Sequence, residues 1–83
     1  MKRMNELEFC DQLSDKEQRN YTGIIDFNEG STIYYKNGYV HREDGPAWYF
    51  TRTEFKEYWI YGIKTTKEGM ELYSSLLKLK GLL

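Results

Sequence analysis

The pair Asn37-Gly38 stands between two segments rich in β-forming residues, "STIYYK" before it and "YVH" after it. Asn and Gly both tolerate the positive φ angles of a type I′ turn, which makes this pair the strongest local signal for a tight β-hairpin. Tyr, Ile, Val and Thr in the flanking segments favour the pleated surface of a strand. The sequence therefore predicts a β-hairpin that turns at residues 37–38.

The β-type pattern continues on both sides of this hairpin, over residues 21–64. "YTGIIDF" precedes it, separated by the turn "NEG", and "AWYFT" and "EFKEYWIY" follow it, with "RT" as the turn between them. Pro46 falls at the start of "AWYFT", where a strand tolerates a missing N–H. We expect an antiparallel sheet of four or five strands.

The segment "HREDGP", residues 41–46, is predicted to contain a further turn. An Asp side chain in a turn commonly accepts hydrogen bonds from backbone N–H groups, which is the role expected of Asp44. Gly45 is expected at a positive φ angle that a side chain would disfavour. The residues predicted to serve structural turns are Asn37, Gly38, His41, Asp44, Gly45 and Pro46.

From residue 65 the apolar spacing changes from alternating to helical. Thr65 and Glu68 fit a capping box at the start of a helix, and Gly81 fits the glycine that ends one. The pattern predicts an amphipathic helix over residues 66–80. We expect its apolar face to lie on the sheet and to cover the core.

The first twenty residues are polar and carry only weak apolar spacing. They favour a short helix or a frayed arm, and Ser14 with Glu17 fits a capping box for a second helical turn. The chain is therefore expected to form a single α+β domain, residues 1–83. Its three parts are the N-terminal arm or helix (1–20), the hairpin sheet (21–64) and the C-terminal helix (65–83).

Composition excludes several classes of protein. Cys10 is the only cysteine among 83 residues, so neither an internal disulfide nor a four-thiolate metal site is possible, which fits a cytoplasmic location. A net charge of −1 provides no overall field toward nucleic acid or an anionic membrane. Signal-peptide, membrane-span, nucleotide-loop and metal-ligand patterns do not occur in the sequence. We expect no cofactor, no metal and no membrane partner.

The chain also resembles itself. A shift of 24 positions aligns four residue pairs: Tyr34 with Tyr58, Tyr35 with Trp59, Gly38 with Gly62, and Gly45 with Gly69. We interpret this as two copies of one hairpin unit. The second copy has "TTKEG" where the first has "HREDG", so it is expected to end the array as a cap.

The segment "YYKNGYVHREDGPAWYF", residues 34–50, resembles a repeat of the form W-x-x-N-G-x-x-H-R-x-D-G-P-A. That repeat occurs in small proteins of bacteria and their phages, and it is loosely similar to MORN repeats. The resemblance implies a β-hairpin array and a phage origin, without a settled biochemical role. It covers residues 34–50 well and the second copy more weakly.

Small phage proteins commonly act by binding a host protein, so the resemblance implies a non-catalytic protein in the host bacterial cytoplasm. We expect it to bind, and to inhibit, a host protein such as a component of a bacterial defence system. Exposed aromatic and arginine side chains are frequent anchors at protein interfaces. The predicted partner-binding residues are Tyr35, Tyr39, Arg42, Tyr49, Trp59 and Tyr61.

Two other functions remain open. An aromatic face of the sheet would suit stacking of single-stranded bases, although acidic residues are interspersed with the basic ones. A small hydrolase would use His41 as a general base oriented by Glu43 or Asp44. Such motifs recur several times in related chains, whereas catalytic sites rarely come in tandem copies, and this favours a structural role for His41.

Overall fold

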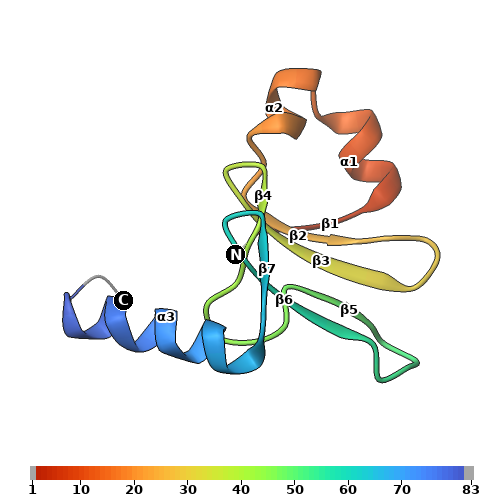
Figure 1. The fold of residues 1–83 in the computed structure, drawn as a ribbon. Helices are drawn as coiled ribbons and strands as arrows, with labels where there is room; N and C mark the ends of the chain where they lie inside the picture. Colours follow the sequence, from red (N-terminus) through yellow and green to blue (C-terminus); the bar gives the residue numbers. More distant parts are fainter. Residues whose placement is uncertain (1, 82–83) are drawn as a thin grey trace.

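The computed structural model describes residues 2–81 and has the α+β architecture that the sequence predicts (Figure 1). Two short helices come early in the chain, a twisted sheet forms its middle, and a longer helix follows. The elements are β1 (Arg3–Asn5), α1 (Glu6–Gln12), α2 (Asp15–Arg19), β2 (Gly23–Asp26), β3 (Ser31–Lys36), β4 (Tyr39–Val40), β5 (Trp48–Phe50), β6 (Lys56–Ile60), β7 (Ile63–Thr65) and α3 (Lys67–Leu79).

The sheet has the strand order β1-β2-β3-β5-β6-β7, and β4 also pairs with β3. Only β1 runs parallel to its neighbour, β2, and the other pairs are antiparallel. The sheet has more strands than the four or five predicted, because β1 joins it from the N-terminal segment and β7 is a separate strand after the second turn. Each has three residues, which is too short to display an alternating pattern.

β4 and β5 lie along the same edge of β3 and form one interrupted strand. The N–H of His41 donates to the carbonyl of Tyr34 (2.9 Å), and the N–H of Tyr34 donates to the carbonyl of Ala47 (2.7 Å). The chain therefore leaves the sheet at residue 42 and rejoins it after residue 46, both times opposite Tyr34 of β3. The segment predicted as a turn is a loop inserted into a strand.

The hairpin turn at Asn37 and Gly38 is confirmed, with φ angles of 51° and 83°. A second turn of the same kind occurs 24 positions later, where Tyr61 and Gly62 have φ angles of 45° and 79°. The residues that flank the two turns pair in equivalent ways, Lys36 with Tyr39 and Ile60 with Ile63. The two hairpins are thus equivalent in turn geometry and register.

The main buried cluster lies between the N-terminal helices and the first strands of the sheet. Met4, Tyr21 and Ile25 form it, and Phe9 and Leu13 pack against it from the helical segment. We expected the core to lie beneath the C-terminal helix. Instead, α1 follows β1 directly and is therefore carried over the same face as Ile25.

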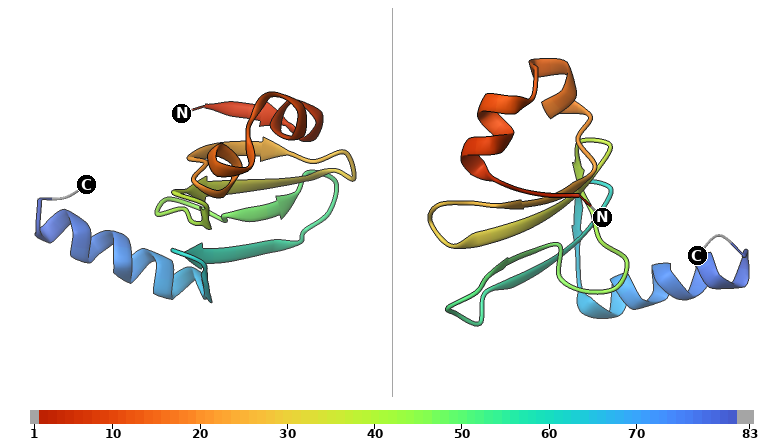
Figure 2. Two further views of the ribbon diagram at one scale, coloured as in Figure 1. Left: turned by 90° about the horizontal axis from the view of Figure 1, so that it is seen from above. Right: turned by 180° about the vertical axis from the view of Figure 1, so that it is seen from behind.

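The helix α3 begins beside the sheet and then projects away from it, at the end opposite α1 and α2 (Figure 2). Met70, in its first turns, is the one residue of α3 that is buried. Tyr73 lies edge-on to His41, with ring centroids 6.1 Å apart. Contact with the rest of the protein is thus concentrated in the first half of the helix.

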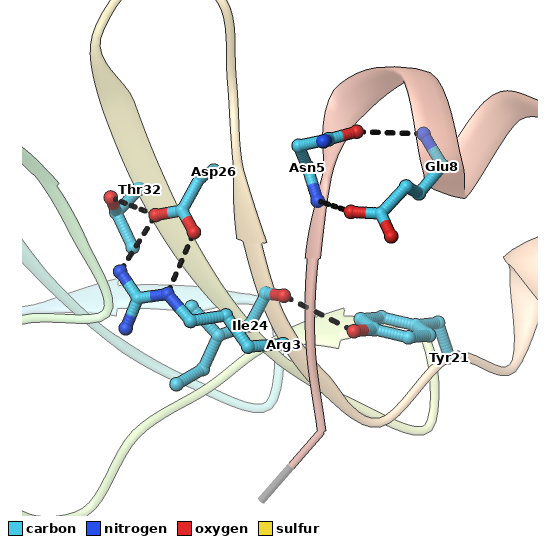
Figure 3. A network of polar contacts seen from close by, with 7 residues as sticks. All are labelled: Arg3, Asn5, Glu8, Tyr21, Ile24, Asp26 and Thr32. Carbon is cyan, nitrogen blue, oxygen red and sulfur yellow. Dashed lines mark hydrogen bonds and ion pairs between the residues drawn. The ribbon is translucent and has the colours of Figure 1, made fainter.

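Polar contacts hold the N-terminal strand and the start of α1 (Figure 3). The guanidinium of Arg3 donates two hydrogen bonds of 2.7 Å to the carboxylate of Asp26, which also accepts from the hydroxyl of Thr32 at 2.9 Å. Asn5 and Glu8 form a capping box at the start of α1. These contacts order a segment that the sequence left open between a helix and a frayed arm.

The predicted capping box of Ser14 and Glu17 is confirmed at the start of α2. The cap of α3 is Thr66, one residue later than predicted, and its side chain accepts from the N–H of Gly69. Gly81 follows the helix at a φ of 69°, as expected for a helix-ending glycine.

Candidate functional site

The first hairpin turn is held by the chain segment that leads into β2. The N–H of Gly38 donates to the carbonyl of Tyr21, and the N–H of Asn37 donates to the hydroxyl of Thr22, both at 2.9 Å. The carbonyl of Tyr21 and the hydroxyl of Thr22 therefore satisfy the two N–H groups at the turn.

The second turn is held in the same way by the last residue of β4 and the residue after it. The N–H of Gly62 donates to the carbonyl of Val40 (2.8 Å), and the N–H of Tyr61 donates to Nδ1 of His41 (2.9 Å). The side chain of His41 thus accepts a hydrogen bond from the second turn as the side chain of Thr22 does from the first. Its ring links two hairpins that are distant in the sequence.

His41 is buried; Nδ1 is hydrogen-bonded to the backbone, and Nε2 lies against the carboxylate of Glu43. Nδ1 accepts from the backbone, so the neutral ring carries its proton on Nε2, which contacts the carboxylate of Glu43. Burial lowers the pKa of His41, the negative charge of Glu43 opposes that shift, and the positive charge of Lys36 adds to it. The ring is therefore neutral at physiological pH, and it stabilises the fold by accepting the hydrogen bond from Tyr61.

The pKa of His41 predicts how stability depends on pH. The unfolded chain binds a proton at His41 near the ordinary pKa of 6.5, whereas the folded protein binds it only at lower pH. The free energy of unfolding should therefore fall as the pH decreases below 6.5, by at most about 1.4 kcal/mol per pH unit. Urea denaturation on both sides of this pH measures the slope.

The matched control is His41→Asn, which should show no such slope in the same window because the chain has no other histidine. Carboxylates with a lowered pKa, such as Asp26, destabilise only at more acidic pH. Stability that rises as the pH falls through 6.5 would show that the Glu43 charge outweighs burial.

Arg42 organises the loop of residues 42–46. Its guanidinium lies over the ring of Tyr34, 4.1 Å from the centroid, and donates to the carboxylate of Asp44 (2.7 Å) and the carbonyl of Pro46 (3.2 Å).

The prediction that Asp44 accepts from backbone N–H groups was wrong, and its side chain is 83% exposed. Gly45 does not have a positive φ angle either; a Cβ there would lie 2.9 Å from Cζ of Arg42. Gly45 provides room for the arginine side chain.

The predicted partner-binding residues do not gather on one surface. Strand alternation places Tyr35 and Trp59 on one face of the sheet and Tyr39 and Tyr49 on the other. Tyr35 packs on the buried cluster, and burial raises the pKa of its hydroxyl. The remaining two members lie off the strands, Tyr61 in the second turn and Arg42 in the loop. The arrangement provides no continuous aromatic platform.

An open groove of about 960 Å³ lies between the loop and α3. The hydroxyl of Ser74 donates to the carbonyl of Glu43 and joins the helix to the loop. The groove carries charges of both signs; its lining includes Lys36, Arg42, Glu43, Asp44, Lys67, Glu71 and Lys78. This mixture suits a polar surface of a protein partner better than a polyanion.

α3 presents a second apolar face, which the helical spacing alone does not distinguish from the first. Leu72, Leu76 and Leu79 are exposed by 62%, 47% and 84% of their surface. Their spacing places them along one side of the helix, roughly opposite Met70. Separating the two faces required knowing which residues contact the sheet.

Among residues 2–81, no three His, Cys, Asp or Glu side chains converge in a way that could hold a metal ion. None of the helices in this part of the chain is long and apolar enough to span a membrane. The fold and these surfaces define a small α+β protein built on two stacked hairpins. Comparison with protein families, curated proteins and solved structures finds no significant match to this chain.

Proposed function

We propose that this chain is a small, phage-type, non-catalytic protein that binds and inhibits a host protein, such as a component of a bacterial defence system. The observation that carries the proposal is the outward leucine face of α3, formed by Leu72, Leu76 and Leu79. An amphipathic helix that inserts its apolar face into a groove is a recurrent mode of protein recognition. Its place of action is the host cytoplasm.

The position of His41 supports a binding role over a hydrolytic one. A general base must come within hydrogen-bond reach of a substrate proton. In this protein Nδ1 is occupied by the backbone of Tyr61 and Nε2 faces Glu43, and the ring is buried. The histidine therefore serves to hold the second hairpin.

The proposal is tested with tagged protein in host lysate and with two matched variants. Leu76→Glu places a charge in the leucine face and should abolish capture of the host protein with little change in melting temperature. Leu7→Glu is the control, because Leu7 is a similarly exposed leucine (64%) on α1, far from this face, and it should retain capture. A partner that binds Leu76→Glu as tightly as the wild type would contradict the proposal.

Inhibition is tested in cells. Expression of the wild-type chain should restore plating of a phage on a host whose defence system contains the captured protein, and Leu76→Glu should not.

The alternative function, nucleic-acid binding through the aromatic residues, predicts salt-sensitive binding of a labelled single-stranded oligonucleotide. Such binding, together with a loss of protein capture, would replace our proposal.

A further inference from the structure

The two hairpin contacts follow one rule, in which a turn with glycine at its second position docks on the edge of the preceding segment. For the second hairpin, the platform is three consecutive residues: Tyr39, Val40 and His41. Val40 supplies the carbonyl and His41 the side-chain acceptor. Tyr39 covers the glycine: a Cβ on Gly62 would lie 3.0 Å from Cδ1 of this tyrosine.

The strand β7 repeats this platform at the end of the sheet. Ile63 follows the second turn as Tyr39 follows the first, and Lys64 pairs with Trp59 in the way that Val40 pairs with Tyr35 in the first hairpin. In an antiparallel hairpin closed by two residues, the pair next to the turn is hydrogen-bonded and the following pair is not. The N–H and carbonyl of Lys64 therefore point away from β6.

The outer edge of β7 is accessible. β7 is the last strand in the order of the sheet, and no described residue forms a further strand beside it. The side chain of Ile63 is 71% exposed, compared with 56% for Tyr39, which covers the neighbouring turn at Gly62. Thr65 has the register position of His41, but its hydroxyl faces the first turn of α3, where a Cβ on Gly69 would lie 2.2 Å from Oγ1. Lys64 and Ile63 are therefore the residues that β7 offers at this edge.

We propose that the outer edge of β7 binds a β-hairpin of a partner protein, one whose type I′ turn has glycine at the second position. The glycine N–H donates to the carbonyl of Lys64, and Ile63 covers the glycine. A second copy of this chain does not fit the role, because its own turn glycines, Gly38 and Gly62, already donate to internal carbonyls. The site is separate from the leucine face of α3.

The test uses isotope-labelled full-length protein and a peptide probe. The probe is the backbone-cyclised segment "FKEYWIYGIKT", residues 55–65, which contains such a turn; cyclisation is needed because an isolated hairpin is only marginally stable. Titration should produce saturable amide shifts at Ile63, Lys64 and Thr65. Ile63→Asp in the protein should weaken binding by about tenfold or more.

Two controls keep the result interpretable. Leu72→Asp changes an exposed leucine on α3 (62%, against 71% for Ile63) and should leave the affinity unchanged, which separates this site from the proposed function. A probe carrying Gly62→Ala should not bind, and this variant leaves the protein itself intact. Shifts confined to α3, or no shifts with the wild-type probe, would overturn the proposal. Shifts at Ile63 and Lys64 that appear on concentrating the protein alone would replace the hairpin partner with a second copy.

Discussion

Gly38→Ala is expected to destabilise the protein by about 3 kcal/mol, because it combines backbone strain with a steric clash. Gly38 has a φ of 83°, which disfavours any side chain. A Cβ at this position would also lie 1.9 Å from the carbonyl oxygen of Arg19, a backbone atom at the end of α2. To relieve the clash, the first hairpin must separate from the segment that holds it.

Gly30→Ala is the matched control for this prediction. Gly30 also has a positive φ, 103°, but a Cβ there would meet no atom within 4 Å. It should therefore cost only the backbone strain, about 1 kcal/mol. Urea denaturation of both variants gives the comparison. Equal losses would show that close packing of the first turn against Arg19 contributes nothing to stability.

His41→Ala is expected to destabilise the protein by about 3 kcal/mol. The substitution leaves a cavity in place of a buried ring and removes the acceptor for the N–H of Tyr61. His41→Asn should recover part of the loss, since its side-chain oxygen lies at the same branch position as Nδ1. Thermal and urea unfolding of the three proteins measure these differences.

Asp44→Ala provides the contrast within the same segment. Among residues 2–81 its carboxylate is hydrogen-bonded by Arg42 alone, and its side chain is 83% exposed, so its removal should cost less than about 1 kcal/mol. The sequence predicted that Asp44 stabilises the turn as an acceptor for backbone N–H groups. A larger loss for Asp44→Ala than for His41→Ala would contradict the role that we assign to the histidine.

Local signals account for the parts of the fold that could be predicted. The turn at Asn37 and Gly38 follows from the φ preferences of two adjacent residues. The capping box of Ser14 and Glu17 is likewise complete within one turn of helix, and α3 follows from a sustained helical period. In each case the interacting groups lie within a few residues of one another, so the sequence itself contains the whole interaction.

Signals for the candidate surfaces were weaker. The leucine face of α3 has a regular spacing, but the same spacing fits a face that covers a core, and only the position of Met70 tells the two apart. The turn at Asn37 and Gly38 already places Tyr35 and Tyr39 on opposite faces of the first hairpin. The register between hairpins, which places Tyr49 and Trp59, was unknown. The partner-binding set was therefore chosen by residue type, and the structure distributes it over several surfaces.

The sequence by itself determined the α+β class, the first hairpin and the C-terminal helix, because these depend on short-range backbone preferences and periodicity. Only the tertiary structure decided that β1 pairs in parallel with β2, that the core lies under α1, and that His41 binds the turn at Tyr61. Each of these depends on groups about twenty positions apart in the chain. Such contacts follow from how the whole chain closes on itself, and no local pattern of residues encodes them.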